Sequence, residues 1–398
     1  MTNILKEKKL SISIIFISLT ILASTNMVYF SFTNAYIFFV VTIILILKNN
    51  TLVYNVNIRH FIIVCILSFY ASIPGETEHF RNLSAFILLP FMFLLSEENK
   101  EKIFKIVSVI FAVSLIPALI DTLSTAILNV NVFPVLSVKY FDDRIYYSYP
   151  FFVKELSFQS VPINRLQGLY DEPGFVGTIG ALILISDKMD IKKWNVVLLF
   201  VACIFTFSLA FYIIIAMYLF YMLVKNMGTK AIKYAIIISL FACFLYYIIN
   251  EYIDLYILRR IFEGERLIIP SGRKEMSDFE FLSYFFAQDV FHIFFGHGYG
   301  SHRISTNLYE YSSWIRIPYD YGLMFVIIFI YFIRSIWSEK ANKIFLILFL
   351  LSIYQRPQIF TPFHFFLIAY NSTSFKENLL EASNMDNLRI VDKKEVNI

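Results

Sequence analysis

Residues 194–224, WNVVLLFVACIFTFSLAFYIIIAMYLFYMLV, form a run of 31 residues without a charged side chain. A helix needs roughly 20 apolar residues to cross the hydrocarbon core of a bilayer, so this run is too long for one crossing. Thr206 and Ser208 form a small polar break within it. We therefore expect two membrane-spanning helices that meet at this break.

The composition of the whole chain agrees with a lipid environment. Hydrophobic residues make up 58% of the 398 residues, charged residues only 16%, and the mean hydropathy is +0.66. Soluble chains carry about a quarter charged residues, so a soluble globular protein is excluded. The net charge of +4 is not gathered into a basic cluster on a recognition fold, which excludes nucleic acid as a partner. Cys65, Cys203 and Cys243 lie inside apolar runs and are interpreted as small buried hydrophobes.

The hydropathy pattern predicts an all-α polytopic membrane protein. Two of its apolar runs are long enough to be split, at Thr206–Ser208 and at 355–358, which gives about 12 (10–12) transmembrane helices. The runs are 10–29, 35–47, 60–73, 83–95, 103–120, 174–185, 194–224, 234–249, 321–337 and 344–370.

The distribution of Lys and Arg predicts the orientation of these helices. With the N-terminus inside and the first helix retained, the Lys/Arg-rich connections around residues 48–59, 100–105, 188–193, 225–233 and 334–343 all fall on one face, which we take as the cytoplasmic one. Two long segments then lie together on the outer face. The expected divisions are 1–125 (N-terminal helices), 126–173 (first large outer loop), 174–250 (central helices), 251–320 (second large outer loop), 321–370 (C-terminal helices) and 371–398 (cytoplasmic tail).

The first outer loop ends in the stretch R-L-Q-G-L-Y-D-E-P-G-F-V-G, residues 165–177. Pro173 and Gly174 suit a turn into the next helix, and Asp171 and Glu172 are favourable near a helix N-terminus. This structural interpretation leaves Arg165 unexplained. The loop also carries an aromatic string, which either stacks on sugars or forms an interfacial belt, the latter being favoured: Tyr146, Tyr147, Tyr149, Phe151 and Phe152.

The second outer loop concentrates basic side chains. Guanidinium groups bind phosphate in a bidentate manner, so an Arg set beside the membrane suits a lipid-linked diphosphate, although snorkelling to headgroups explains any single Arg equally well. The candidate set is Arg259, Arg260, Arg266, Arg273 and Lys274. Ser277 and Glu280 form a capping box, which predicts an amphipathic helix at the outer interface.

The same loop contains G-H-G-Y-G-S-H-R, residues 296–303, with His297, His302 and Arg303. Its glycines suit a backbone nest for an anion, but the stretch lacks the Lys of a phosphate-binding loop. Adjacent carboxylates such as Asp142 with Asp143 point apart more often than together, so we expect no metal.

Taken in order, these stretches resemble a known family. R-x-x-G-x-x-x-E-P-x-x-x-G from Arg165, T-F-S at 206–208, S-G-R ending at Arg273, G-H-G-Y-G from 296 and Y-D-Y-G-L at 319–323 are similar to motifs of the bacterial O-antigen polymerase (Wzy) family and the related O-antigen ligase. The resemblance covers residues 165–322.

The resemblance implies a multi-pass enzyme of the bacterial inner (cytoplasmic) membrane, whose loops facing the periplasm carry two essential arginines, Arg165 and Arg273. Its substrates would be undecaprenyl-diphosphate-linked oligosaccharides, with a polysaccharide chain-length regulator as a candidate partner and no cofactor or nucleotide sugar. Arg side chains would stabilise the leaving diphosphate, while Glu172 or His302 would serve as general base. The substrate-binding residues would be Gly168, Asp171, Arg259, Arg260, Arg266, Lys274, His297 and Arg303.

Two other classes stay open. In ligases a His of the second loop is commonly followed closely by Asn, whereas here Thr306 and Asn307 lie four and five residues beyond His302, which favours a polymerase. A flippase or transporter would place ionisable residues near the middle of the membrane and show repeated halves. Here the charged residues lie in two unequal loops instead, which favours chemistry at the surface over a transport path. A third class, a non-catalytic receptor, would leave Arg165 and Arg273 replaceable.

Overall fold

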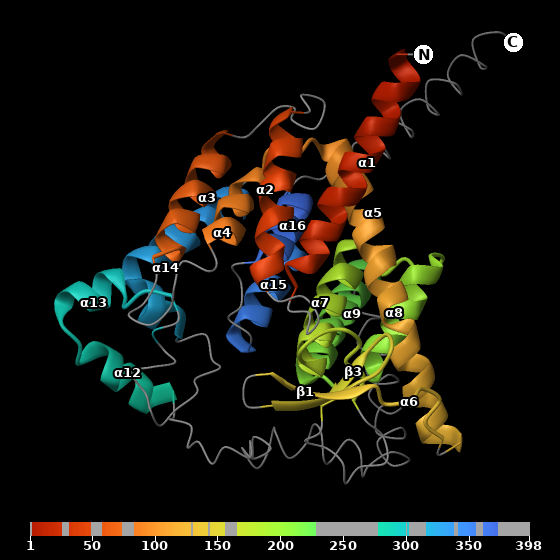
Figure 1. Ribbon diagram of the computed structural model, residues 1–398. Helices are drawn as coiled ribbons and strands as arrows, with labels where there is room; N and C mark the ends of the chain where they lie inside the picture. The colour runs from red at the N-terminus through yellow and green to blue at the C-terminus, as the bar shows by residue number, and fades with distance from the viewer. Residues whose placement is uncertain are drawn as a thin grey trace, which may run out of the picture.

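The computed structural model describes residues 2–25, 32–48, 58–73, 83–128, 130–141, 144–155, 165–227, 278–299, 301, 316–337, 341–355 and 361–372. These residues are mostly helical (Figure 1). In the described part of the chain, two helical stretches are long and apolar enough to cross a membrane, Glu97–Leu128 and Ile317–Trp337. The helical class is therefore confirmed, whereas a count of about twelve crossings stays a prediction.

Helices account for the predicted apolar runs that fall within the described residues. The run 234–249 lies outside them, as does the tail beyond residue 372. The helices that match the runs are α1 (Thr2–Ala23), α2 (Phe32–Lys48), α3 (Ile58–Ala71), α4 (Leu83–Phe91), α5 (Glu97–Ser114), α7 (Pro173–Ser186), α8 (Trp194–Ile204), α9 (Leu209–Met227), α14 (Arg316–Trp337), α15 (Lys343–Gln355) and α16 (Pro362–Asn371).

The long run 194–224 divides where its polar residues predicted. Helix α8 ends at Ile204 and α9 begins at Leu209, and the chain reverses between them. The reversal follows from two contacts: the ring of Phe200 lies 6.1 Å from that of Phe211, and the hydroxyl of Tyr212 donates to the carbonyl of Ile204 at 2.7 Å. Phe207 takes a left-handed φ of 47°, which L-residues rarely adopt outside tight turns.

Helix α7 occupies the centre of the molecule. All its residues from Pro173 to Ser186 are buried, and it packs against α8, α9, α15 and α16. A helix that is apolar on every side lies in a protein core or in a membrane, and here other parts of the protein enclose it. Gly180 permits the closest approach, because a Cβ there would lie 2.2 Å from Sγ of Cys203 on α8.

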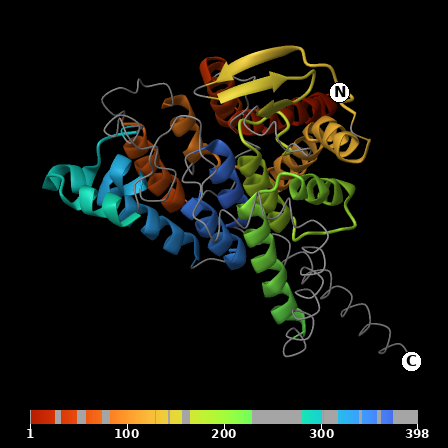
Figure 2. The ribbon, with the colours of Figure 1, turned by 90° about the horizontal axis from the view of Figure 1, so that it is seen from below.

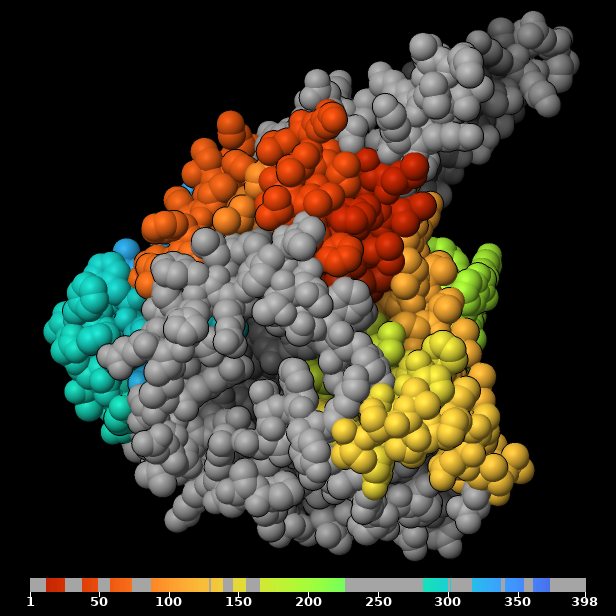
Figure 3. Space-filling view, in the orientation of Figure 1, coloured from red at the N-terminus to blue at the C-terminus, as the bar shows by residue number. Residues whose placement is uncertain are grey.

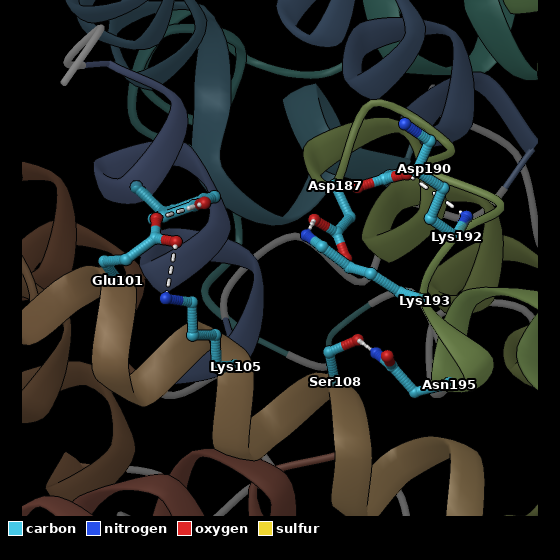
Figure 4. Close-up of polar contacts among 9 residues, drawn as sticks. Glu101, Lys105, Ser108, Asp187, Asp190, Lys192, Lys193 and Asn195 are labelled. Atoms are coloured by element: carbon cyan, nitrogen blue, oxygen red, sulfur yellow. Dashed lines mark hydrogen bonds and ion pairs between the residues drawn. The ribbon is translucent and has the colours of Figure 1, made fainter. Parts of the chain in front are cut away.

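The Lys-rich ends of several helices gather at one end of the bundle. The Tyr370 hydroxyl at the end of α16 donates to Glu101 at 2.8 Å near the start of α5, and Asn371 donates to Ser186 at the end of α7 at 2.8 Å. Beside them Lys193 pairs with Asp187, and Asn195 donates to Ser108 (Figure 4). These contacts place the connections around 100–105, 188–193 and 341–343 together, and the side of a membrane on which they lie stays a prediction.

The first long connection is not a simple loop. Helix α6 (Ile116–Leu128) continues from α5 past Leu115, so the helical part ends three residues later than the predicted boundary at 125. It is followed by an antiparallel sheet of order β1-β2-β3: β1 (Ser137–Phe141), β2 (Arg144–Ser148) and β3 (Val153–Glu155). The antiparallel register pairs Ser137 with Ser148 at one end of β1 and Phe141 with Arg144 at the other. The sheet lies outside the bundle (Figures 1 and 2).

The described part of the second long connection contains two short helices. Helix α12 spans Asp278–Phe286 and α13 spans Val290–Phe295. The sequence pattern predicted one amphipathic helix after Ser277, whereas the described residues contain two, because Asp289 caps α13 by accepting a bond from the His292 N–H. The start of α12 at Asp278 agrees with the predicted capping box, whose Ser277 lies outside the described residues.

Candidate functional site

Arg165 is held by the turn between α8 and α9. Its Nε donates to the Thr206 carbonyl at 2.9 Å and its Nη2 donates to the Phe207 carbonyl at 3.3 Å. The side chain is 9% exposed. Hydrogen bonds from a charged donor to carbonyls are stronger than neutral ones, so the guanidinium ties the first outer connection to the T-F-S turn. The neighbouring Leu166 N–H adds a 2.9 Å bond to the Phe205 carbonyl.

The stretch from Gln167 to Asp171 folds on itself. Nε2 of Gln167 donates to the carbonyls of Tyr170 at 2.8 Å and Asp171 at 3.0 Å. Gly168 has a φ of 66°, and a Cβ there would lie 2.8 Å from a methyl group of Leu115. A glycine is therefore required at this position by backbone conformation, and close packing adds to the requirement.

The tyrosine of this stretch is anchored between α5 and α7. Tyr170 is fully buried, and its hydroxyl lies 3.2 Å from Oγ of Ser114 at the end of α5. Its ring packs against Phe111 at a centroid separation of 5.0 Å. Burial raises the pKa of Tyr170, so its hydroxyl stays protonated and uncharged at neutral pH.

The sheet covers the same stretch. The Val153 N–H of β3 donates to the Gly168 carbonyl at 2.8 Å, and the hydroxyl of Tyr146 on β2 donates to the Asp171 carbonyl at 3.0 Å. Tyr146, Tyr149 and Phe152 are buried, so these three aromatic side chains belong neither to an interfacial belt nor to an open sugar-stacking surface. Phe151, in contrast, is 59% exposed.

A buried ion pair fixes the sheet to α6. Lys154 of β3 contacts Asp121 of α6, with 6% and 0% of their side chains exposed. The Lys154 ammonium also lies 5.3 Å from the ring centre of Tyr149 and 5.8 Å from that of Phe152. The nearby Asp121 and burial both raise the pKa of Tyr149, burial more strongly. Each charge is compensated chiefly by its partner, which makes removal of either one costly.

Glu172 stands at the start of α7. It is the N-cap residue, Pro173 follows in the first turn, and the Glu172 side chain makes no capping hydrogen bond. This agrees with the turn predicted from Pro173 and Gly174. An acidic side chain at this point is also favoured by the helix dipole.

An open apolar pocket adjoins this group of residues. It has a volume of about 440 Å³ and lies where α5 meets α6, beside the turn between β2 and β3. Leu169 places one wall of the pocket next to the Arg165 stretch. Its lining is Val113, Ser114, Pro117, Pro150, Phe151 and Leu169.

The second group joins G-H-G-Y-G to Y-D-Y-G-L. The N–H groups of His297 and Gly298 donate to the carbonyls of Tyr319 and Asp320 at 3.1 and 2.8 Å. The His297 ring stacks between His292 and Tyr319, at centroid separations of 4.1 and 4.6 Å. His297 is thus part of a packed turn.

Two glycines allow this junction. A Cβ on Gly296 would lie 2.4 Å from the Asp320 carbonyl oxygen, and one on Gly322 would lie 2.3 Å from the Phe294 carbonyl oxygen. Both glycines have a positive φ, 75° and 77°. The backbones therefore touch directly, and the predicted anion nest is instead occupied by protein carbonyls at the N–H groups of His297 and Gly298.

The structure brings Arg165, Gly168, Asp171 and Glu172 together, but it does not bring them to His297. The two groups lie at opposite sides of the bundle (Figures 1 and 2). Among the described residues no group of three or more His, Cys, Asp or Glu side chains could hold a metal ion. The other candidates lie outside the described residues: Arg259, Arg260, Arg266, Arg273, Lys274, His302 and Arg303.

Sequence reasoning missed the partners of this site. The contacts of Tyr146, Lys154 and Asp121 connect segments that are distant in the sequence. A signal for the strands was nevertheless present, since 137–141 and 144–148 are short runs rich in Val, Ile, Tyr and Phe around the pair Asp142–Asp143. No protein-family model, curated protein or solved structure matches this chain.

Proposed function

We propose that this protein is a membrane glycosyltransferase that polymerises undecaprenyl-diphosphate-linked oligosaccharide repeat units. The supporting observation is the contact of Arg165 with the T-F-S turn, which joins two of the stretches that resemble the O-antigen polymerase family although 41 residues separate them. The contact lies at the end of α7 opposite to the Lys-rich connections. The proposal therefore places the chemistry on the outer face of a multi-pass inner-membrane protein with about twelve crossings.

In the proposed reaction the growing glycan moves to a new lipid-linked unit. A hydroxyl oxygen of the acceptor sugar forms a bond to the anomeric carbon of the donor, and the bond from that carbon to the diphosphate oxygen breaks. The hydroxyl proton passes to a base, for which Glu172 and His302 are the candidates, and undecaprenyl diphosphate leaves. Negative charge develops on the diphosphate, where Arg165 and Arg273 would stabilise it.

The contacts of Arg165 refine its proposed role. Two carbonyls fix the guanidinium in one orientation, which is what a preorganised anion-binding group requires. The sheet and Gln167 hold the adjacent backbone in the same way. In the proposal the first outer connection is thus a rigid half of the site, and the segment that contains Arg273 supplies the other half.

The experiment is reconstitution of the purified protein in liposomes with two lipid-linked repeat units, followed by separation of products by length. The wild type is expected to form a ladder of longer glycans, and Arg165→Ala and Arg273→Ala to lower the rate by about 10²–10³, as loss of a charge-stabilising donor does. Arg144→Ala, an arginine of β2 outside the candidate set, is the matched control.

The alternatives give different products. A ligase would transfer the glycan to a lipid A-type acceptor and form no ladder from two lipid-linked units. A flippase would move labelled units between leaflets without any change in their length. Intact ladders in both arginine variants would contradict the catalytic proposal.

A further inference from the structure

Helix α13 carries an exposed apolar surface at the outer end of the bundle. Four of its six residues, Val290, Phe291, Phe294 and Phe295, are between 43% and 70% exposed, and we call them the α13 apolar face. Phe286 at the end of α12 is also 60% exposed. Figure 3 shows α12 and α13 (cyan) at the edge of the molecule, next to α3 (orange). Soluble proteins rarely expose aromatic side chains in such a group.

The exposed side chains share one side of α13. Successive residues of a helix are about 100° apart, so the four residues of the face fall within an arc of about 140°. The other two residues lie outside that arc. Ile293 packs against the small buried cluster of Phe285 and Tyr319, and His292 pairs with the carboxylate of Asp289. Helix α13 therefore has an apolar side, a side facing the protein and a charged edge.

The α13 apolar face lies beside exposed apolar residues on α3. The Tyr70 hydroxyl donates to the Phe295 carbonyl at 3.2 Å, and the Tyr299 N–H donates to the Ile73 carbonyl at 2.8 Å. On α3 the exposed residues Ile62, Ile66 and Phe69 recur at helical spacing. They point away from the core, like the face of α13.

A second stripe runs along α14, which packs against both α3 and α13. Its exposed residues Met324, Ile327 and Ile330 are spaced by three. Helix α14 is one of the two described stretches that are long and apolar enough to span a bilayer. At the far end of these stripes Arg59 donates to the Tyr331 hydroxyl at 2.6 Å, a cation and an aromatic residue of the kind that mark a membrane–water boundary.

We propose that α13, with the end of α12, lies in the outer membrane–water interface and inserts Phe291, Phe294 and Phe295 among the lipid chains. The occupant of the α13 apolar face is the bilayer, because the exposed apolar residues of α3 and α14 continue onto this face. The Asp289–His292 pair forms the polar edge of α13. The inference rests on the proposed membrane topology and is independent of the transfer reaction.

The placement has a consequence for the turn that follows. Gly296 comes directly after Phe295, and its backbone is in contact with that of Gly322. An anchored α13 would therefore hold the G-H-G-Y-G turn at the level of the lipid headgroups. In the proposed function this is the level at which the diphosphate of a lipid-linked substrate lies.

Nitroxide accessibility tests the placement. A cysteine-free background, with Cys65, Cys203 and Cys243 replaced by Ala, receives single cysteines at Phe291, Phe294 or Asp289 and is reconstituted in phosphatidylcholine–phosphatidylglycerol vesicles. Ile327 is the lipid-facing reference and Lys192 the aqueous one. Labels at 291 and 294 should collide more with oxygen than with a water-soluble nickel complex, as at 327. The label at 289 should resemble that at 192.

Two outcomes would overturn the inference. Labels at 291 and 294 that match position 192 would place α13 in water. Labels shielded from both oxygen and the nickel complex would show that protein, such as a second copy of this chain, covers the face. If a label at 291 lowers the yield of folded protein, positions 286 and 295 report on the same surface. Collision rates do not depend on catalysis, so loss of the transfer activity would leave this result unaffected.

Discussion

The Arg165 guanidinium and the Thr206 carbonyl are joined by a 2.9 Å hydrogen bond that connects the first outer connection to the turn between α8 and α9. A second bond reaches the neighbouring Phe207 carbonyl. Phe207 has a strained left-handed conformation, so the bonds of Arg165 stabilise a turn that is unfavourable by itself. Arg165 thus determines both the shape of the candidate site and the course of the chain at this turn.

Replacement of Arg165 should destabilise the fold as well as reduce activity. Arg165→Ala removes two charged hydrogen bonds and leaves two carbonyls without this donor, and bonds to charged groups contribute about 1.5–3 kcal/mol each. Arg165→Lys keeps the charge but lacks the planar fork, so an intermediate Tm is expected. Thermal unfolding in detergent measures the effect, with Arg144→Ala as control. An unchanged Tm for Arg165→Ala would show that the turn does not depend on these bonds.

The proposed orientation predicts opposite labelling of two exposed positions. Phe151 lies in the turn between β2 and β3, and Lys192 lies in the Lys-rich connection between α7 and α8. In the cysteine-free background a membrane-impermeant maleimide should label Phe151→Cys in intact cells and Lys192→Cys only after permeabilisation. Labelling of both positions from the same side would refute the topology.

The contact between α7 and α8 predicts a compensating pair of substitutions. A Cβ at Gly180 would lie 2.2 Å from Sγ of Cys203, so Gly180→Ala should lower Tm, and overpacking of this kind costs typically about 1–3 kcal/mol. Cys203→Ala removes the clashing sulfur. The double variant is therefore expected to recover most of the lost stability. Equal losses in the single and double variants would contradict this packing.

The buried Asp121–Lys154 ion pair also predicts a pair of substitutions in which the second restores stability lost through the first. Lys154→Met leaves a buried carboxylate without its cation, and such a change costs about 3–5 kcal/mol. The double variant Asp121→Leu/Lys154→Met removes both charges and should come close to wild-type Tm. If Lys154→Met alone were as stable as wild type, the pair would not be what holds the sheet on α6.

The close contact of Gly296 with Gly322 predicts that a side chain at either position disturbs the junction between the G-H-G-Y-G turn and the start of α14. Gly322→Ala places a Cβ 2.3 Å from the Phe294 carbonyl oxygen at a φ that disfavours any side chain. The variant should separate the G-H-G-Y-G turn from the start of α14 and shorten the glycan ladder. Met324→Ala, at a partly exposed position two residues further on, is the control. A normal ladder from Gly322→Ala would show that the junction is dispensable.

The sequence predicted the helices better than it predicted the site. Hydropathy locates helices because each turn of a buried helix needs apolar residues. Thr206 and Ser208 also marked the position at which the chain reverses between α8 and α9. The sheet at 137–155 was missed because short strands are difficult to distinguish in a chain in which most segments are rich in apolar residues. The contact of Arg165 was missed because side chains that pair across 41 residues leave no periodic signal. The helix break before Asp289 was detectable from its capping chemistry.

The enclosure of α7 also bears on how the chain is assembled. Its neighbours α8 and α9 follow immediately in the sequence, but α15 and α16 are made more than 150 residues later. During synthesis one side of α7 therefore lacks its protein neighbours until α15 and α16 have been made. A fragment that stops before α15 would keep that side open, so the molecule cannot be completed as two halves that mature independently.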